Sequence, residues 1–427
     1  MREMKDSGIE WIGEIPKEWV CCKVKNATSF VGSGTTPTSS NQEFYDGDIS
    51  WIQSGDLYKA AAVESVEKKL TLKALKSFSA LHIYQAPFIV MAMYGASVGN
   101  TAFSKIDACC NQACCCIKNN EFFNLNFMYY WLILAKIDFL GRAIGGTQPN
   151  ISQEKIRNQH IVKPSLEEQQ QIAGFLDTQC SEIDATAEDI QKEISLLEDY
   201  KKSVINEAVT KGLNPDAEMK DSGIEWIGEI PKDWNVDKIK YHLKRNEPKN
   251  PGNAIVLSVY RDYGVIPKDS RDDNHNVTSE DTSKYKYVKK GQLVINKMKA
   301  WQGSLAVSDY DGIVSPAYFI YDFIDEEYNH KYFHYLVRSC YKEEFKRISG
   351  GIREGQWDLS PEGFSNTLIL LPSVEEQNRI LDYILQKEME IDSLIADKKR
   401  QLDILADYKK SLIYEYVTGK KEVPVNE

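Results

Sequence analysis

Residues Met4–Pro16 read MKDSGIEWIGEIP, and the same letters recur at Met219–Pro231. A later stretch also repeats, since Pro164–Gln169 (PSLEEQ) returns as Pro372–Gln377 (PSVEEQ). A period of this length is far above the roughly 20–50 residues of a solenoid repeat. The chain is therefore a duplicated unit whose framework is repeated and whose two middles differ. Such a duplication favours a protein that does one job at two places on two different targets.

The composition is that of an ordinary globular protein. The chain has 427 residues, of which 42% are hydrophobic and 27% charged, and this length allows roughly two to four domains. No apolar run reaches the ~18 residues of a membrane span, and the opening MREMKDSGIEW has no apolar signal-peptide core. The nine cysteines are odd in number and mostly adjacent, which suits a reducing compartment. We expect a cytoplasmic protein that does not contact a membrane.

The net charge of −11 hides a division that matters for nucleic-acid binding. Residues 164–220 hold 5 basic and 13 acidic residues, whereas residues 232–300 hold 15 basic and 9 acidic residues. Acid is thus concentrated in a repeated tail and base in a variable middle. Because local charge decides where phosphates can bind, the middles are the candidate DNA-binding parts.

Each middle is expected to fold as a mixed α/β head. In residues 20–160, the patterns at Ile49–Ile52 and Phe88–Met93 predict strands, and the aromatic stretch Phe122–Phe139 predicts an amphipathic helix. The second head, residues 223–371, repeats this order. Its expected strands are Asn253–Tyr260 and Gln292–Ile295, and its expected helix is Tyr332–Phe345.

Two long helices are predicted at residues 165–211 and 373–419. Each begins after a proline with a Ser-x-x-Glu capping box, and apolar residues recur every seven positions, as in a coiled-coil seam. Lys398 stands where the first helix has Ile190, a change that can fix pairing in a coil. The seam residues are Leu176, Ile183, Ile190, Leu197 and Val204, followed in the second helix by Ile384, Ile391, Leu405 and Leu412.

Neither apolar seam can remain in water, so we expect the two helices to pair with each other. The expected fold is α+β (mixed α/β), with two globular α/β heads separated by an antiparallel two-helix coiled coil in a pseudo-twofold internal duplication. A head would lie at each end of the coil, and the two chain termini would lie close together. The expected segments are residues 1–163, 164–217, 218–371 and 372–427.

Catalytic motifs are missing from the sequence. It has no GxxxxGK[ST] phosphate loop and no Asn/Asp-Pro-Pro-Tyr/Phe tetrad of adenine methyltransferases. Pro215–Lys220 resembles a PD…ExK nuclease motif only superficially, because its acids are crowded into one linker. The run Cys109–Cys116 lacks metal-ligand spacing, and His330 and His334 lack a third ligand nearby, so a buried strand and a packing or surface role are favoured. We expect no catalytic residue and no metal site, although clustering of the six histidines in space stays open.

Three motifs carry a resemblance to a known family. They are SGIEWIGEIPKEW (Ser7–Trp19), PSLEEQQQIAGFLD (Pro164–Asp177) and VINKMKAWQGSLAVSDYDGIVSPAYFIY (Val294–Tyr321). In this order they resemble the DNA specificity subunits of type I restriction–modification systems, over essentially the whole chain. The resemblance implies two target-recognition domains held apart by paired helices, in a protein that binds double-stranded DNA.

The resemblance also implies partners and cofactors. Two modification (adenine methyltransferase) subunits would dock on the helices, and restriction/translocase subunits, expected as two, would join them. This chain would bind no cofactor itself, since S-adenosylmethionine, ATP and Mg²⁺ would bind to those partners. The two unlike heads would then read an asymmetric, bipartite site, with the helices setting the gap between its halves.

The candidate DNA-reading residues lie in the polar loops of the two heads. Amides and arginine can pair with the edges of adenine and guanine, whereas lysine favours phosphate. The alternative for each residue is a solvated loop or a structural turn. The candidates are Thr35, Thr36, Ser39, Asn41, Tyr94, Ser97, Thr147, Gln148 and Asn150 in the first head, and Arg261, Tyr263, Lys297, Lys299, Trp301, Gln302, Arg353 and Gln356 in the second.

Two other functions remain possible from the sequence. The chain could be the recognition part of a single-chain methyltransferase or nuclease, which the missing catalytic motifs disfavour. It could also be a structural coiled-coil scaffold, which would explain the helices but not why the heads diverged while the framework did not.

Overall fold

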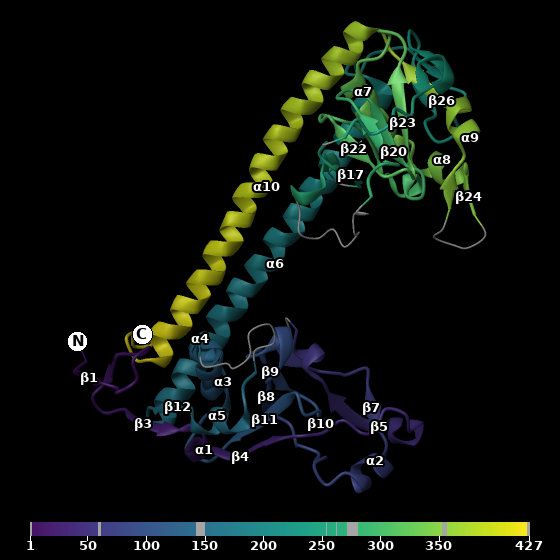
Figure 1. Cartoon of the computed structure of the whole chain (residues 1–427). Helices are drawn as coiled ribbons and strands as arrows, with labels where there is room; N and C mark the ends of the chain where they lie inside the picture. The colour runs from purple at the N-terminus through teal and green to yellow at the C-terminus, as the bar shows by residue number, and fades with distance from the viewer. Residues whose placement is uncertain are drawn as a thin grey trace. The chain divides into compact units, whose positions relative to one another are not determined.

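A computed structural model describes residues 2–58, 61–141, 150–252, 254–261, 263–270, 281–351 and 357–424. The chain divides into two compact units, and Figure 1 shows the elements of both. Unit 1 is Met1–Ile190 with Arg400–Glu427, and unit 2 is Gln191–Lys399. Both units are mixed α/β. Across the described ranges, none of the helices combines the length and the apolar character that a bilayer crossing needs.

The head of unit 1 is built on a five-stranded sheet. The strand order is β4-β11-β8-β9-β6, and all neighbours are antiparallel except β9 and β6. The strands are β4 (Thr28–Ser33), β6 (Ala62–Val63), β8 (Phe88–Ala92), β9 (Thr101–Ser104) and β11 (Cys114–Asn119).

Alternate residues of this sheet enter two separate cores, because successive side chains of a strand point to opposite faces. Ile89 and Met91 pack with helix α3 (Leu125–Leu134), whereas Val90 and Cys116 join a second buried cluster. The cysteines of the run are buried, as predicted, but they lie in two strands, because a turn at residues 111–113 separates Cys109–Cys110 from β11.

The predicted helix Phe122–Phe139 is divided in the structure, so its prediction as one helix was wrong. Helix α3 begins late because the Asn124 side chain caps it, with Oδ1 accepting the N–H of Phe127 at 3.0 Å. Ala135, with ψ of −8°, separates α3 from α4 (Lys136–Gly141).

A smaller group of elements lies beside the main sheet of unit 1. Strand β5 pairs antiparallel with β7 and parallel with β10, over a core that includes Trp51 and Leu70. The elements are η1 (Gln42–Phe44), β5 (Tyr45–Ile52), η2 (Ser54–Leu57), β7 (Lys69–Leu70), α2 (Leu72–Ser77), η3 (Gly95–Ser97) and β10 (Cys109–Cys110).

The head of unit 2 repeats the two-sided design with a four-stranded antiparallel sheet, β16-β23-β20-β21. Leu293 and Ile295 pack with helix α7, whereas Val294 joins a cluster under β17 and β18. The elements are β16 (Leu243–Arg245), β17 (Leu257–Tyr260), β18 (Gly264–Pro267), β19 (Lys286–Val288), β20 (Leu293–Asn296), β21 (Leu305–Val307), β22 (Gly312–Val314), β23 (Tyr318–Phe323), α7 (His330–Cys340) and α8 (Lys342–Arg347).

Two predictions for this head need correction. The strand expected from Asn253 begins only at Leu257, and the helix expected from Tyr332 begins at His330 and is divided before Lys342. The earlier start has a local cause, since the Asn329 side chain accepts the N–H groups of Lys331 and Tyr332 and so caps α7.

The repeated sequence folds identically in the two units. Hairpin β1 (Met4–Asp6) with β2 (Glu14–Pro16) places Met4 opposite Pro16, and β13 (Met219–Asp221) with β14 (Glu229–Pro231) has the same register. After each hairpin comes a buried tryptophan, Trp19 or Trp234. The next strands also correspond. They are β3 (Val20–Lys23), which pairs with β12 (His160–Lys163), and β15 (Asn235–Lys238), which pairs with β26 (Leu368–Leu371).

The two long helices are α6 (Leu166–Lys211) and α10 (Val374–Val417). Both begin at the predicted caps, because Ser165 Oγ accepts the N–H of Glu168 and Ser373 Oγ accepts that of Glu376, each at 3.2 Å. Helix α10 ends two residues before the predicted limit. Gly419 follows with φ of +71°, a conformation that favours glycine.

Within each unit, part of α6 packs antiparallel against part of α10. In unit 1, Lys409 pairs with Asp184 at 2.6 Å, and the rings of Phe175 and Tyr416 lie 4.5 Å apart. In unit 2, Lys201 pairs with Asp392 at 2.9 Å, and Lys398 pairs with Glu193 at 2.5 Å. Leu197 and Leu405 are half-buried, and the remaining seam residues are buried, namely Leu176, Ile183, Ile190, Val204, Ile384, Ile391 and Leu412.

The N-terminal hairpin packs on the end of the last helix, inside unit 1. Tyr414 donates its hydroxyl to the carbonyl of Ile12 at 3.1 Å, and Lys420 donates to the carbonyls of Ile12 and Glu14 at 2.9 and 3.1 Å. A Cβ atom on Gly419 would lie 2.5 Å from Pro16, so this contact requires glycine. The two ends of the chain therefore meet, as the repeat predicts.

A buried glutamine joins each head to the start of its long helix. In unit 1, Gln169 Oε1 accepts the N–H of Asn124 at 2.8 Å, while Nε2 donates to the carbonyls of Pro164 at 3.1 Å and Phe122 at 3.2 Å. In unit 2, Gln377 makes the same bonds to Asn329, Pro372 and Glu327 at 2.8, 2.9 and 2.7 Å. One repeated side chain thus satisfies three backbone groups in each unit.

Replacing this glutamine should destabilise its unit. We expect Gln169→Leu to lower the free energy of unfolding by about 2–4 kcal/mol, because it leaves buried backbone groups without partners. Urea denaturation followed by circular dichroism measures the effect. The neighbouring Gln170 is exposed, so Gln170→Leu is the control and should change the value by no more than about 0.5 kcal/mol. Equal effects of the two changes would contradict the assigned role.

Candidate nucleic-acid interface

Several loops of unit 1 meet at one end of its sheet. They include the loop after β4, the turn after β8, the turn before β11 and residues 150–151. The N–H of Ile151 donates to the carbonyl of Met93 at 2.8 Å, and the next residue, Tyr94, forms an isolated bridge with Asn150. Met93 donates in turn to the carbonyl of Ala113 at 2.7 Å. The loop after β4 joins this group, because the Thr36 hydroxyl donates to Gln112 Oε1 at 2.6 Å. Four of the predicted reading residues, Thr35, Thr36, Tyr94 and Asn150, therefore come from loops that touch.

The candidates of unit 1 differ in exposure. Thr36, Ser39 and Tyr94 are exposed, and Thr35, Asn41 and Asn150 are half-buried. Asn41 has a structural task, since its side chain accepts the N–H of Glu43 at 3.1 Å and caps η1. Ser97 is 9% exposed, so among the described members of the set it is the least accessible to a base. Thr147 and Gln148 lie outside the described residues.

In unit 2, the turn after β20 packs against the short strand β25 (Asp358–Leu359). Leu359 donates its N–H to the carbonyl of Lys297 at 2.9 Å, and the Lys297 ammonium pairs with the Asp358 carboxylate at 2.7 Å. The rings of Trp301 and Trp357 lie 5.4 Å apart. Strand β25 pairs with β24 (Ser349–Gly350), and α9 (Pro361–Asn366) follows it. Arg353 and Gln356 fall between these strands in the sequence and lie outside the described residues.

The turn between β17 and β18 adds a cation to this group. The Arg261 guanidinium donates to Gln302 Oε1 at 3.4 Å, and Gln302 lies in η6 (Ala300–Gln302). The backbone of Arg261 is fixed by helix α7, because the Arg338 side chain of that helix donates to the carbonyl of Arg261. Tyr263 is 57% exposed, and Lys299 is also exposed. The structure therefore gathers Arg261, Lys297, Lys299, Trp301 and Gln302 in one loop cluster.

The two loop groups occupy equivalent places in the two heads. The bond from Ile151 to Met93 corresponds to that from Leu359 to Lys297, since Ile151 and Leu359 each precede the serine that caps a short helix, α5 (Gln153–Asn158) or α9, and each bonds the turn that follows a central strand. The side chains differ, however. Unit 1 presents hydroxyl and amide groups with a tyrosine, whereas unit 2 presents cations and tryptophans. The same scaffold thus carries two chemically different surfaces.

The sequence analysis missed three residues of these groups. Gln112 was assigned to a buried strand, but it is exposed in the turn before β11. Met298, which is 48% exposed, and Trp357 complete the apolar part of the group in unit 2. The polar pair Asn111-Gln112 between two cysteine runs was the available signal for a turn.

His330 and His334 do not form a metal-binding pair. The His330 ring stacks on Phe323 with centroids 4.0 Å apart, and His334 Nδ1 accepts the N–H of Val307 at 3.2 Å. Burial, with smaller contributions from the Arg338 and Lys331 cations, lowers the pKa of His334 to about 3. Both histidines thus pack the head, in agreement with the sequence analysis.

Comparisons with known proteins identify relatives of the chain. The family model described as the type I restriction modification DNA specificity domain matches residues 16–196. The type I restriction enzyme MjaIX specificity subunit of Methanocaldococcus jannaschii is 30% identical over 265 residues, which cover 60% of this chain and 58% of that relative. The MjaVIII specificity subunit of the same organism is 24% identical over 431 residues, with 96% and 94% covered. The match thus spans less than two thirds of the first relative and nearly all of the second.

Solved structures share the fold. A chain from work on complex assembly and conformational transition of the type I R-M system superposes with a TM-score of 0.68 at 14% identity, covering 95% of this chain and 99% of that one. The crystal structure of the HsdS subunit from Thermoanaerobacter tengcongensis gives a TM-score of 0.51 at 15% identity, with 95% and 98% covered.

The low pKa of His334 predicts a pH dependence for unit 2. The group binds a proton more readily unfolded, with a pKa near 6.5, than folded, with a pKa of about 3. The contribution of His334 to the free energy of unfolding is therefore fully present above pH 6.5 and is lost as the pH falls towards 3. We expect unfolding of the chain at pH 5 to become easier by about 1–2 kcal/mol relative to pH 7 through this group. His334→Asn keeps a hydrogen-bond acceptor but does not titrate. Urea denaturation of this variant should therefore give a smaller difference in the free energy of unfolding between pH 5 and pH 7. An unchanged difference would show that His334 is not its cause.

Proposed function

We propose that this chain, a relative of the type I restriction enzyme specificity subunits, reads a bipartite, asymmetric double-stranded DNA site. In this proposal it does no chemistry itself and leaves methylation and cleavage to partner subunits. One observation carries the proposal: each unit has the same framework and presents a loop group of different chemistry at the same place.

The side chains in the two loop groups suit base and phosphate recognition. In unit 2, the Arg261 guanidinium can donate to guanine in the major groove. The Gln302 amide can both donate to and accept from adenine, and Lys299 suits a phosphate. In unit 1, Gln112 and Asn150 provide amides beside the Thr36 hydroxyl and the Tyr94 ring. Because the two sets differ, the two half-sites should differ in sequence.

The paired helices would set the distance between the half-sites. The antiparallel contacts of Lys409 with Asp184 in unit 1 and of Lys201 with Asp392 in unit 2 support a coil that runs along both helices. Helix α6 has 46 residues, which correspond to roughly 70 Å at ~1.5 Å per residue. In this proposal, a head at each end of such a coil contacts one half-site, and the gap reflects the helix length.

A repeated apolar surface supports docking of two identical partners. Leu196 and Tyr200 of unit 2 are 68% and 54% exposed, and their counterparts in unit 1, Ile404 and Tyr408, are 60% and 52% exposed. Residues four apart share a helix face, so each pair forms one patch. Exposed apolar patches of this kind mark interaction sites. In unit 2 the patch continues into a groove of about 890 Å³ lined in part by Val204 and Tyr383.

The partners of this proposal are two adenine methyltransferase subunits, one on each patch. Restriction/translocase subunits, expected as two, would join the complex through them. S-adenosylmethionine, ATP and Mg²⁺ would then be bound by those subunits and not by this chain.

Exchanging one head should change one half of the methylated site. We expect replacement of residues 20–160 by the corresponding head of a related subunit to alter one half and leave the other half and the gap unchanged. Single-molecule sequencing of methylated adenines in cells carrying the system measures both halves, with the unaltered chain as control. A change in both halves would contradict the proposal, as would methylation or cleavage of DNA by the purified chain alone with S-adenosylmethionine and Mg²⁺.

Removing one patch should remove one partner. We expect Leu196→Ser with Tyr200→Ser to leave a complex with one methyltransferase subunit, and Ile404→Ser with Tyr408→Ser to do the same from the other unit. The four changes together should abolish docking, since both apolar patches are then lost. Native mass spectrometry of the co-expressed complex counts the subunits. The exposed pair Lys202→Ser and Lys410→Ser is the control, and a variant of all four patch residues that still binds two subunits would contradict this docking surface.

A further inference from the structure

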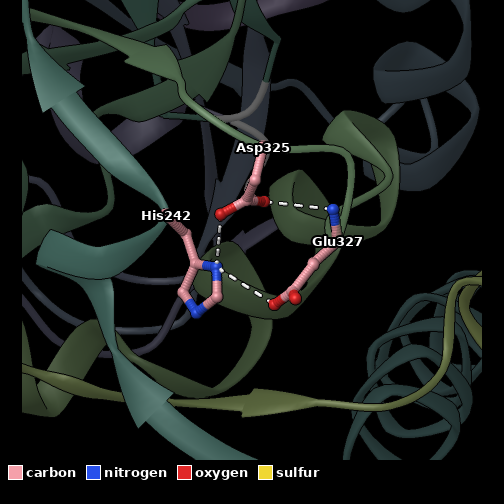
Figure 2. A group of neighbouring side chains, drawn as sticks. All are labelled: His242, Asp325 and Glu327. Atoms are coloured by element: carbon pink, nitrogen blue, oxygen red, sulfur yellow. Dashed lines mark hydrogen bonds and ion pairs between the residues drawn. The ribbon is translucent and has the colours of Figure 1, made fainter.

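A histidine and two carboxylates of unit 2 converge beside the start of β16. The His242 side chain is 3% exposed, and its Nδ1 atom lies 2.9 Å from Asp325 Oδ2 and 3.8 Å from Glu327 Oε2 (Figure 2). One atom from each of the three side chains lies within 4.8 Å of the other two. His242 follows η4 (Ile239–Tyr241), and both acids lie in the loop between β23 and α7, so the cluster joins segments distant in the sequence.

We propose that His242, Asp325 and Glu327 bind one divalent transition-metal cation. Its protein ligands would be one imidazole nitrogen and two carboxylate oxygens, and water would complete the coordination. A mixed nitrogen and oxygen donor set of this kind suits Mn²⁺ or Zn²⁺ rather than a soft, thiolate-preferring ion.

The surroundings orient these groups as they would around a metal. The other ring nitrogen of His242, Nε2, lies 3.3 Å from Asp237 Oδ2. An Nε2–H donated to this carboxylate leaves the Nδ1 lone pair for the cation, the arrangement common among metal-binding histidines. Asp325 is held as well, because its Oδ1 accepts the N–H of Glu327 at 3.0 Å and its Oδ2 faces the ring (Figure 2). The His242 ring also packs edge-on against Tyr328, at 5.0 Å.

The surrounding negative charge favours a divalent cation at this place. Nδ1 of His242 and Oδ2 of Asp325 lie 2.9 Å apart, a separation at which both atoms could coordinate one cation. Three carboxylates, those of Asp237, Asp325 and Glu327, surround the ring. A divalent ion would supply two positive charges against these three negative ones. The shared electrostatic gain grows with that charge in a partly buried site.

Unit 1 shows that the fold does not require these charges. In unit 1, Asn120 is the counterpart of Asp325, and its Oδ1 accepts the N–H of Phe122 at 3.1 Å in the same kind of turn. Phe122 itself stands in place of Glu327. By the framework repeat, Ala27 occupies the position of His242 and Cys22 that of Asp237. The same corner thus forms in unit 1 without a histidine or a carboxylate at these four positions, so the cluster of unit 2 is not needed to build the fold and is free to serve another role.

The bound ion would strengthen the junction between the head of unit 2 and α10. The carbonyl of Glu327 accepts Gln377 Nε2 at 2.7 Å, and the N–H of Asn329 donates to Gln377 Oε1 at 2.8 Å. A cation held by Asp325 and Glu327 therefore fixes the loop on which the buried glutamine of α10 depends. Its role is structural, and it stands or fails independently of the proposed DNA reading.

Mn²⁺ is the suitable probe, because it favours carboxylates and imidazole over the thiols of this cysteine-containing chain. The full chain is freed of metal with EDTA, and free Mn²⁺ is measured by electron paramagnetic resonance during titration. We expect one Mn²⁺ per chain and an increase in the melting temperature. The isosteric double variant Asp325→Asn with Glu327→Gln should lose both effects. Glu326→Gln, in the same exposed loop, is the matched control and should keep them.

A second variant separates a metal site from an ordinary ion-pair cluster. Asp237→Asn leaves all three proposed ligands in place and should weaken Mn²⁺ binding about 10–100-fold, the usual effect of removing a carboxylate that orients a ligand. Circular dichroism confirms that each variant is folded, and Glu327→Gln alone replaces the double variant if that one is not. The proposal is overturned if the unaltered chain binds no Mn²⁺ beyond the level of the Asp325/Glu327 variant, or if Asp237→Asn binds with unchanged affinity.

Discussion

A buried amide at the first turn of each long helix is the interaction on which both units depend. Gln169 and Gln377 each satisfy three backbone groups, two of them in the loop that enters the amphipathic helix of the head. A backbone group without a partner is costly in a dry interior. The head cannot turn on its helix without breaking these bonds, so the framework holds each loop group in a fixed position relative to the helix that carries it.

The two-sided sheets explain how such a rigid head can carry variable loops. Alternate residues of β8 and β20 fill separate cores on the two faces of the sheet. Packing on both faces fixes the strands, whereas the loop side chains at their ends lie outside the two cores. Side chains such as Trp301 and Tyr94 can therefore differ between the heads without disturbing a core. The chemistry of each surface is independent of the stability of its support.

The sequence predicted those features that depend on local pattern and repetition. The long helices start within one residue of their predicted caps, because Ser165 and Ser373 carry an unambiguous signal. The shorter helices were predicted less well, since asparagine caps and the kink at Ala135 depend on packing. The sequence indicated which loops carry candidate reading residues, but it did not predict which of these loops contact one another. Contacts such as Thr36 with Gln112, or His242 with Asp325, join residues far apart in the chain, and a single sequence contains no sign of them.

The identical hairpins Met4–Pro16 and Met219–Pro231 have a consequence for inheritance. Each precedes a head and is followed by a buried tryptophan in the same register. A crossover at equivalent codons of this repeated segment would join the two parts in frame. The recombinant would keep every contact of the hairpin, and a complete head would pass with its own loops. Whole heads could therefore be exchanged as modules, without passing through a misfolded intermediate sequence.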